Sequence, residues 1–380
     1  MKYPLFKVKI NLEDTIDRIK SVLSSGYLNE GVQVHEFRDA LCDILDHKNI
    51  TPTNSCTSAI SMALRLSNVQ PGDEVITTSM TCVATNTPIQ FMGAKVVWAD
   101  INSETGNIDP DQVRSCITPK TKAVICVNWA GNPCELEKLW RICRENNIKL
   151  IQDAAHALGS MYKEKHVCHF ADYTCYSFQA IKHITCGDGG AIVCHSEEDH
   201  LRARAMKWFG IDRDKAKDLK GEWKGQRWEV DVEEAGHKFH MNNISATIGI
   251  SNLASYEEVV GTHKRNGKIY DALFSESSSI SPIKIESFSN SAYWVYTVIL
   301  KDGINRDKIA ERLNALGINA GLVHVPNHPY TCFKESLKDL PETDKFSRQQ
   351  VSLPCGWWLK ESDIEDIAKT LIEECERISG

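Results

Sequence analysis

Short apolar runs of β-forming residues alternate with helical segments over the first 250 residues of the chain. This alternation constrains the fold more than any other feature. We expect buried strands at 74–77, 95–98, 122–127, 149–152, 173–178 and 191–194. Helices are expected around them, at 16–23, 36–45, 56–66 and 135–146. Because helical crossovers make successive strands parallel, the pattern predicts an α/β fold with a mainly parallel sheet covered on both faces.

The pattern changes after residue 212. Residues 212–238 are rich in charge, glycine and tryptophan and lack a clear period, so we expect a long loop or a protruding hairpin there. One long helix is expected next, then a strand and two further helices, at 243–260, 293–300, 306–316 and 361–378. The change predicts two domains: a large α/β domain at residues 1–250 and a smaller C-terminal α+β domain at residues 251–380.

Charge and apolar patterning exclude several classes of protein. The 380-residue chain has a formal net charge of −7, the wrong sign for gripping nucleic acid through a basic surface. No apolar run is long enough for a secretory signal or a membrane-spanning helix. The 14 cysteines include no CxxC pair, which favours reduced thiols in a cytoplasmic enzyme. His166, Cys168 and His169 lack the paired spacing of a zinc site, so no metal is expected.

Asp153 and Lys182 stand shortly after predicted strands. Asp153 directly follows the strand at 149–152, and the carboxyl ends of parallel strands border the crevice where α/β sheets bind ligands. Lys182 follows the strand at 173–178 and precedes the glycine-rich turn at 187–190. Each residue alone also has a plain interpretation, since Asp153 could cap the next turn and Lys182 could be a solvated lysine.

Hydroxyl side chains complete the pattern. Ser177 lies five positions before Lys182, and the run NSCTSA at 54–59 opens the predicted helix at 56–66. A helix start leaves backbone N–H groups free and carries the positive end of the helix dipole, which suits a phosphate, although an ordinary serine N-cap would look the same. A Schiff-base lysine, a carboxylate for a pyridinium nitrogen and a hydroxyl near a phosphate are the set that pyridoxal phosphate requires.

The chain resembles the DegT/DnrJ/EryC1/StrS group of sugar aminotransferases, pyridoxal-phosphate enzymes with the fold type I, aspartate aminotransferase-like architecture. The stretches that carry the resemblance run from about residue 12 to residue 378 in the family's order. They read NSCTSAISMAL, PGDEVIT, DAAHALGS, SFQAIKHITCGDGGAIV, KWFGIDR and GHKFHMNNISATIGISNL. The resemblance implies that Lys182 forms the Schiff base and carries a proton between cofactor and substrate. It also implies that Asp153 keeps the pyridine nitrogen protonated.

The resemblance further implies how the cofactor's ring and phosphate are held. His156 would touch the phenolic oxygen of the ring. An aromatic side chain usually stacks on the ring at the position of Cys82, so this chain would place a thiol there. The phosphate would lie against Ser177 and the start of the helix, at Cys56, Thr57 and Ser58.

The segment at 236–241 resembles a family segment that crosses a dimer interface. Lys238 on this segment would reach the phosphate in the neighbouring subunit, which implies a homodimer with shared active sites. His240 would replace an arginine or asparagine contact of the family. Trp129 and His324 are further candidates for the substrate pocket, although Trp129 could belong to a plain turn and His324 to a solvated loop.

The activity that the resemblance implies is transamination of a sugar. L-Glutamate would donate the amine, leaving pyridoxamine phosphate, and a nucleotide-diphosphate-linked keto-deoxy sugar would accept it. The form KHITCGDGG resembles the branch that acts on 4-keto-6-deoxyhexoses, and the family often serves bacterial surface glycans such as the lipopolysaccharide O-antigen. A related 3-dehydratase carries His at the position of Lys182, so Lys182 favours transamination. A 3-dehydratase, a 3-aminotransferase and a non-catalytic regulatory homologue remain alternatives.

Overall fold

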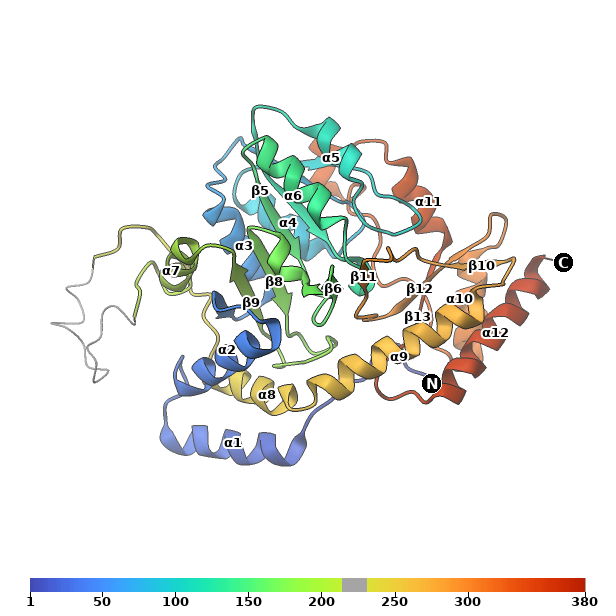
Figure 1. Ribbon diagram of the computed structural model, residues 1–380, viewed down its shortest axis with the longest axis horizontal. Helices are drawn as coiled ribbons and strands as arrows, with labels where there is room; N and C mark the ends of the chain where they lie inside the picture. The colour runs from blue at the N-terminus through green and yellow to red at the C-terminus, as the bar shows by residue number, and fades with distance from the viewer. Residues whose placement is uncertain (214–230, 380) are drawn as a thin grey trace.

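The computed structural model describes residues 1–213 and 231–379, and its central feature is one large sheet (Figure 1). The strands of this sheet are β1 (Ile50–Thr53), β2 (Glu74–Thr77), β3 (Lys95–Trp98), β4 (Thr121–Val127), β5 (Lys149–Asp153), β8 (Tyr173–Ser177) and β9 (Gly190–Cys194). Their order is β1-β9-β8-β5-β4-β2-β3. The pairs from β8 to β3 are parallel, whereas β9 is antiparallel to both β8 and β1. The predicted α/β fold with a mainly parallel sheet is confirmed.

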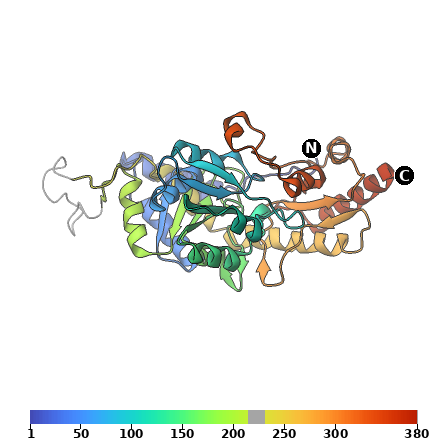
Figure 2. The same ribbon diagram turned by 90° about the horizontal axis from the view of Figure 1, so that it is seen from above.

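Neighbouring residues of the parallel strands pack into two separate apolar cores. Val75 and Ile125 face one core, and Ile76 and Val124 face the other, as the twofold period of a strand requires. The first core is closed by α3 (Cys56–Leu66), α4 (Val83–Phe91) and α7 (Glu197–Met206). The second is closed by α2 (Val32–Leu45), α5 (Pro110–Cys116), α6 (Leu136–Glu145) and α8 (Asn243–Leu253). The sheet therefore lies between two helical layers (Figure 2).

The prediction of one helix at 243–260 is wrong. The chain forms α8 and then α9 (Tyr256–Phe274), with a break at Ala254 and Ser255. Ser255 has φ −100° and ψ 10°, and its hydroxyl donates to Asn11 Oδ1 at 3.2 Å. Local hydrogen bonding by serine competes with helix continuation, and the apolar period on both sides of the break hides it in the sequence.

The C-terminal part forms a smaller α+β unit. Its antiparallel sheet has the order β10-β12-β13, and α9 runs from the large sheet to this unit (Figure 1). Tyr3 joins its apolar core and pairs with Ile318, so the N-terminus also lies here. The boundary expected at residue 250 falls inside α8. The other elements of this part are β10 (Ile280–Pro282), β12 (Tyr296–Leu300), β13 (Gln350–Leu353), α10 (Arg306–Ala315), α11 (Pro341–Gln349) and α12 (Glu361–Ser379).

A further helix and a short three-stranded sheet belong to the described fold. The helix α1 (Leu12–Ser25) packs against α8, and it extends past both ends of the helix predicted at 16–23. A short sheet joins β11 (Ser289–Asn290) to β6 (Met161–Tyr162) and β7 (Lys165–His166). Within residues 1–213 and 231–379, no helix has the length and apolarity to cross a membrane, and no cluster of three or more ligating side chains could hold a metal ion.

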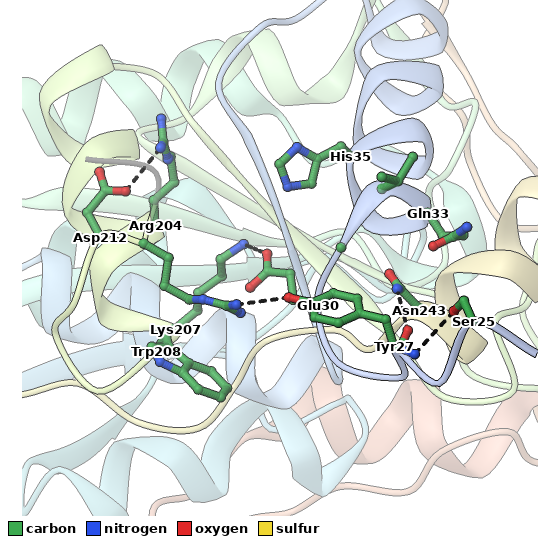
Figure 3. Close-up of a pocket in the computed structure, with 13 residues that line it drawn as sticks. Ser25, Tyr27, Glu30, Gln33, His35, Arg204, Lys207, Trp208, Asp212 and Asn243 are labelled. Atoms are coloured by element: carbon green, nitrogen blue, oxygen red, sulfur yellow. Dashed lines mark hydrogen bonds and ion pairs between the residues drawn. The ribbon is translucent and has the colours of Figure 1, made fainter. Parts of the chain in front are cut away.

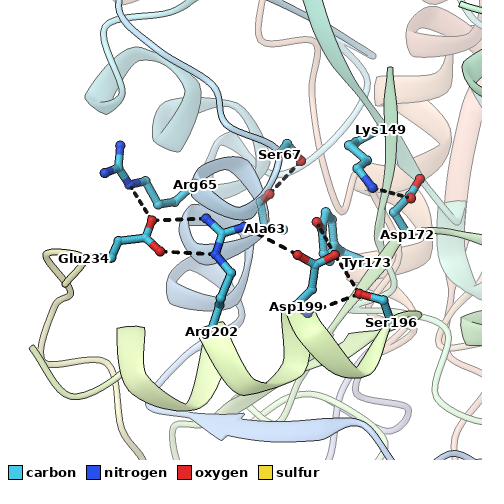
Figure 4. A network of polar contacts seen from close by, with 10 residues as sticks. All are labelled: Ala63, Arg65, Ser67, Lys149, Asp172, Tyr173, Ser196, Asp199, Arg202 and Glu234. Atoms are coloured by element: carbon cyan, nitrogen blue, oxygen red, sulfur yellow. Dashed lines mark hydrogen bonds and ion pairs between the residues drawn. The ribbon is translucent and has the colours of Figure 1, made fainter. Parts of the chain in front are cut away.

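A polar network fixes the chain where it returns to the sheet after residue 230. Glu234 accepts two hydrogen bonds from Arg202 of α7, both at 3.2 Å, and Arg65 of α3 reaches the same carboxylate at 3.3 Å (Figure 4). This network anchors the segment that continues to His240. Of the loop or hairpin predicted at 212–238, residues 214–230 lie outside the described part of the chain.

Candidate active site

Asp153 is the last residue of β5 and is buried at the carboxyl end of the sheet. Its Oδ2 atom accepts a hydrogen bond from the Thr85 hydroxyl of α4 at 2.7 Å, and Oδ1 accepts one from the Ala155 N–H at 3.0 Å. Burial raises the pKa of Asp153, and these two hydrogen bonds oppose the shift. The carboxylate is thus held rigidly from two sides.

Lys182 lies in the loop between β8 and β9, within electrostatic range of Asp153. Burial lowers the pKa of Lys182 to about 8, and the attraction of the Asp153 carboxylate offsets part of that shift. Its Nζ atom lies 3.7 Å from the centroid of the Trp294 ring. A lysine with this pKa has a substantial neutral fraction near neutral pH, which a nucleophile or proton carrier needs.

The start of α3 lies beside the same carboxylate. Ser55 caps the helix, since its Oγ atom accepts the Ser58 N–H at 3.1 Å. The N–H groups of Cys56 and Thr57 point out of the first turn and have no acceptor within the helix. The Cys56 thiol is 4.0 Å from Asp153 Oδ1. Of the three residues predicted to bind phosphate here, Ser58 therefore has its N–H engaged in the cap.

Gly190 of β9 sets the position of this helix start. Replacing Gly190 with alanine is expected to destabilise the protein by about 2 kcal/mol. The ideal Cβ would lie only 2.4 Å from Cys56 N and from the Ser55 carbonyl carbon, which are backbone atoms. Urea unfolding measures the loss. The control is Gly261→Ala in α9, where an added Cβ meets nothing within 4 Å, so no loss is expected. Equal stability of the two variants would contradict this packing.

His156 and His324 form a stack with Trp294. The His156 ring lies 3.9 Å from the Trp294 ring at 14°, and the two histidine Nε2 atoms are 3.4 Å apart. Burial lowers the pKa of His156 well below its usual range and that of His324 to about 3, so both rings are neutral at pH 7. Among the described residues, His156 Nδ1 has no hydrogen-bond partner. A buried polar atom without a partner points to a ligand.

Trp129 lies behind His324 and is only 1% exposed. Its indole N–H donates to Thr297 Oγ1 at 3.3 Å, and its ring meets the His324 ring edge-on at 5.9 Å. Direct contact with a substrate stays a prediction for Trp129. In this structure the indole supports His324.

Cys82 and Ser177 border the cluster from two other elements. Cys82 is the N-cap of α4 and lies within electrostatic range of Lys182. Ser177 ends β8, and its Oγ atom accepts the Gln179 N–H at 3.4 Å. The cluster therefore joins most of the predicted cofactor residues. These are Cys56, Thr57, Cys82, Asp153, His156, Ser177 and Lys182.

Lys238 and His240 have other neighbours than the residues clustered around Lys182. The Asn54 N–H donates to the Phe239 carbonyl at 2.7 Å, and its side chain donates to the Lys238 carbonyl at 3.3 Å, so this segment passes the start of α3. His240 Nε2 lies 2.6 Å from Asn29 Oδ1, and its ring meets Trp208 at 4.4 Å. His240 thus belongs to a second polar region.

A cavity of about 630 Å³ opens in this second region, between α2, α7 and the start of α8 (Figure 3). Its wall holds a partly buried ion pair between Lys207 and Glu30, together with Tyr27, Trp208 and Asn243. The Asn243 Oδ1 atom is buried and has no hydrogen-bond partner among the described residues. The cavity combines cationic and aromatic surfaces, which suits an anionic molecule with a flat ring.

The residues around Lys182 fit pyridoxal phosphate. Lys182 could bond to it covalently, and the rigid, buried Asp153 could pair with a pyridinium nitrogen. The free N–H groups at the start of α3 suit its phosphate. His156 Nδ1 offers an unused polar atom nearby.

Comparison with known proteins agrees with this class of enzyme. The chain belongs to the DegT/DnrJ/EryC1/StrS aminotransferase family, whose model matches residues 10–372. It is similar to the sugar aminotransferase CalS13 of Micromonospora echinospora (29% identity, 98% and 99% of the two chains, TM-score 0.90). It is also similar to the PMP form of a putative sugar aminotransferase of Streptococcus pneumoniae (26%, 100% and 99%, TM-score 0.90). The Bacillus subtilis spore coat polysaccharide biosynthesis protein SpsC is 26% identical over 94% of each chain. The protein is a pyridoxal-phosphate-dependent sugar aminotransferase.

Sequence reasoning missed Thr85 and Trp294. Thr85 carries no signal in the sequence, because a threonine inside an apolar helix usually bonds to its own backbone. Trp294 stands in an apolar run that predicts only a strand. Their contacts with Asp153 and Lys182 depend on the tertiary fold.

Proposed function

We propose that this enzyme transfers the amino group of L-glutamate to a nucleotide-linked keto-deoxy sugar, with a 4-keto-6-deoxyhexose as the preferred acceptor. The observation that carries the proposal is the pairing of Lys182 with the buried Asp153 at the carboxyl end of the sheet. A dehydratase would not need the lysine amine as a proton carrier. A purely regulatory protein would not need the pair at all.

Residues of this chain would have separate roles in the proposed reaction. Pyridoxal phosphate, when bound, withdraws electrons from the carbon that carries the substrate nitrogen. Lys182 would hold the cofactor through Nζ, and the same nitrogen, once free, would act as the general base and then the general acid that carries the substrate proton. Asp153 would keep the pyridine nitrogen protonated. Ser177 and the first N–H groups of α3 would orient the phosphate.

The acceptor would extend from this cluster toward the second polar region. The cavity lined by Lys207 and Trp208 supports an anionic nucleotide part, whose base could stack and whose diphosphate could meet the cations. We propose a cytoplasmic homodimer in which Lys238 serves the partner's site. The similarity to a spore coat polysaccharide protein supports a place in surface-glycan synthesis, of which the O-antigen is one example.

The absorbance spectrum with and without L-glutamate tests the donor half of this proposal. We expect a band near ~420 nm that moves to ~330 nm when glutamate is added, as the cofactor accepts the amine. A panel of 4-keto and 3-keto sugar nucleotides should then restore the first band, with the 4-keto compounds acting fastest. A band that ignores glutamate would refute glutamate as donor. Faster reaction of the 3-keto compounds would refute the assigned position.

A further inference from the structure

Trp294 connects the C-terminal unit to the loop that carries Lys182. It stands two residues before β12 and is 2% exposed. Its indole N–H donates to the Ile181 carbonyl at 2.8 Å, and its ring lies under Lys182 Nζ at 3.7 Å and against the His156 ring at 3.9 Å. One side chain thus contacts Lys182, the residue before it and a predicted cofactor contact.

Contacts other than those with Lys182 hold Trp294 in place. The backbone N–H of Trp294 donates to the Ala130 carbonyl at 2.9 Å, and the Phe6 ring stacks on the indole at 4.9 Å and 27°. An ammonium over the face of a tryptophan is attracted by the ring's negative face, most strongly where water is excluded. A preorganised ring also lowers the entropy cost of ordering a long lysine side chain.

We propose that Trp294 is a positioning residue for the reaction, which receives the amine of Lys182 on its indole face whenever that amine is not bonded to the cofactor. This inference rests on the role proposed above for Lys182. The hydrogen bond to Ile181 fixes the backbone at the base of the lysine, and the ring face fixes the nitrogen at its tip. The released amine therefore stays beside the reacting atoms.

The ring also stabilises the charged form of the amine, which burial disfavours. The titratable groups that act on Lys182 come from several elements: Asp153 of β5, Cys56 of α3, Cys82 of α4, and His156, His183 and His324. Burial keeps the three histidines neutral, so Asp153 supplies the one formal charge of this set. Replacing Trp294 with leucine removes the ring face and leaves all of these groups in place.

The test measures the pKa of Lys182 in cofactor-free protein, through the pH dependence of amine labelling read by mass spectrometry on the Lys182 peptide. Burial is expected to lower the wild-type pKa to about 8. Trp294→Leu is expected to lower it by about one unit, and Trp294→Phe, which keeps a ring face, by less. The rate of cofactor capture should follow the same pH shift.

The matched control is Trp357→Leu. Trp357 also has a lysine over its ring, Lys9 at 4.7 Å, and also donates its N–H to a carbonyl, that of Lys7, but at the surface. It should leave the Lys182 titration unchanged. A wild-type pKa in Trp294→Leu, or equal shifts in the leucine and phenylalanine variants, would overturn the proposal.

A separate readout keeps this inference distinct from the function it rests on. Borohydride reduction of the wild-type holoenzyme should fix the cofactor on the Lys182 peptide. If the label appears on another lysine, the proposed role of Lys182 fails, whatever the Trp294 variants show. If Lys182 is labelled but its titration ignores Trp294, only the positioning role fails.

Discussion

Lys182→Ala is expected to lower the rate of transamination by ~10⁴-fold or more, because one change removes both the covalent anchor and the proton carrier. The protein should remain folded, since burial disfavours the charge of this lysine and alanine removes that cost. The measurement is the single-turnover rate of the glutamate half-reaction, followed by the cofactor spectrum. Circular dichroism reports the fold of the variant.

A small primary amine added to Lys182→Ala should restore part of the rate, because it can carry the proton without the covalent link. The control is Lys165→Ala on the exposed strand β7, which should behave like the wild type. Near-normal activity of Lys182→Ala would assign the chemistry to another residue. A variant that is inactive, folded and insensitive to added amines would limit Lys182 to holding the cofactor.

The parallel core of the fold could be predicted because its strands are short apolar runs with burial on both faces. The strand β1 was missed because its sequence ITPT is polar and contains a proline, and it is held by pairing with β9 at the edge of the sheet. The helix α4 was missed for a similar reason, since Pro88 interrupts its pattern. Local sequence patterns do not predict an element whose formation depends on tertiary contacts.

The grouping of Lys182 with Asp153 could be predicted from the residue types that pyridoxal phosphate requires and from the family resemblance. The residues that contact this pair and hold it in position could not be predicted. Thr85 and Trp294 reach it from α4 and from the C-terminal unit, and no periodicity reports a contact between segments so far apart in the chain. His240 was expected near the substrate. Its contact with Asn29 could not be predicted, because the two residues are far apart in the chain.

Asp153→Asn is expected to separate activity from stability. Transamination should fall by about 10²–10³-fold, because an amide cannot stabilise a charged pyridine nitrogen as a carboxylate does. The local structure should survive, since the amide oxygen can still accept the Ala155 N–H, and the Thr85 hydroxyl can accept from the amide nitrogen instead of donating. Steady-state kinetics with glutamate and a keto acceptor measure the first effect.

Asp153→Asn should lower the activity without lowering the free energy of unfolding of the cofactor-free protein. Burial raises the pKa of Asp153 above its ordinary 3.8, so the unfolded chain loses this proton at a lower pH than the folded one. The free energy of unfolding of the wild type therefore declines as the pH rises from 3.8 through the raised pKa, and Asp153→Asn lacks that contribution. Unfolding measured across this range should find the variant at least as stable at neutral pH. If Asp153 merely capped its turn, as its bond to Ala155 allows, the variant would lose stability and keep its activity.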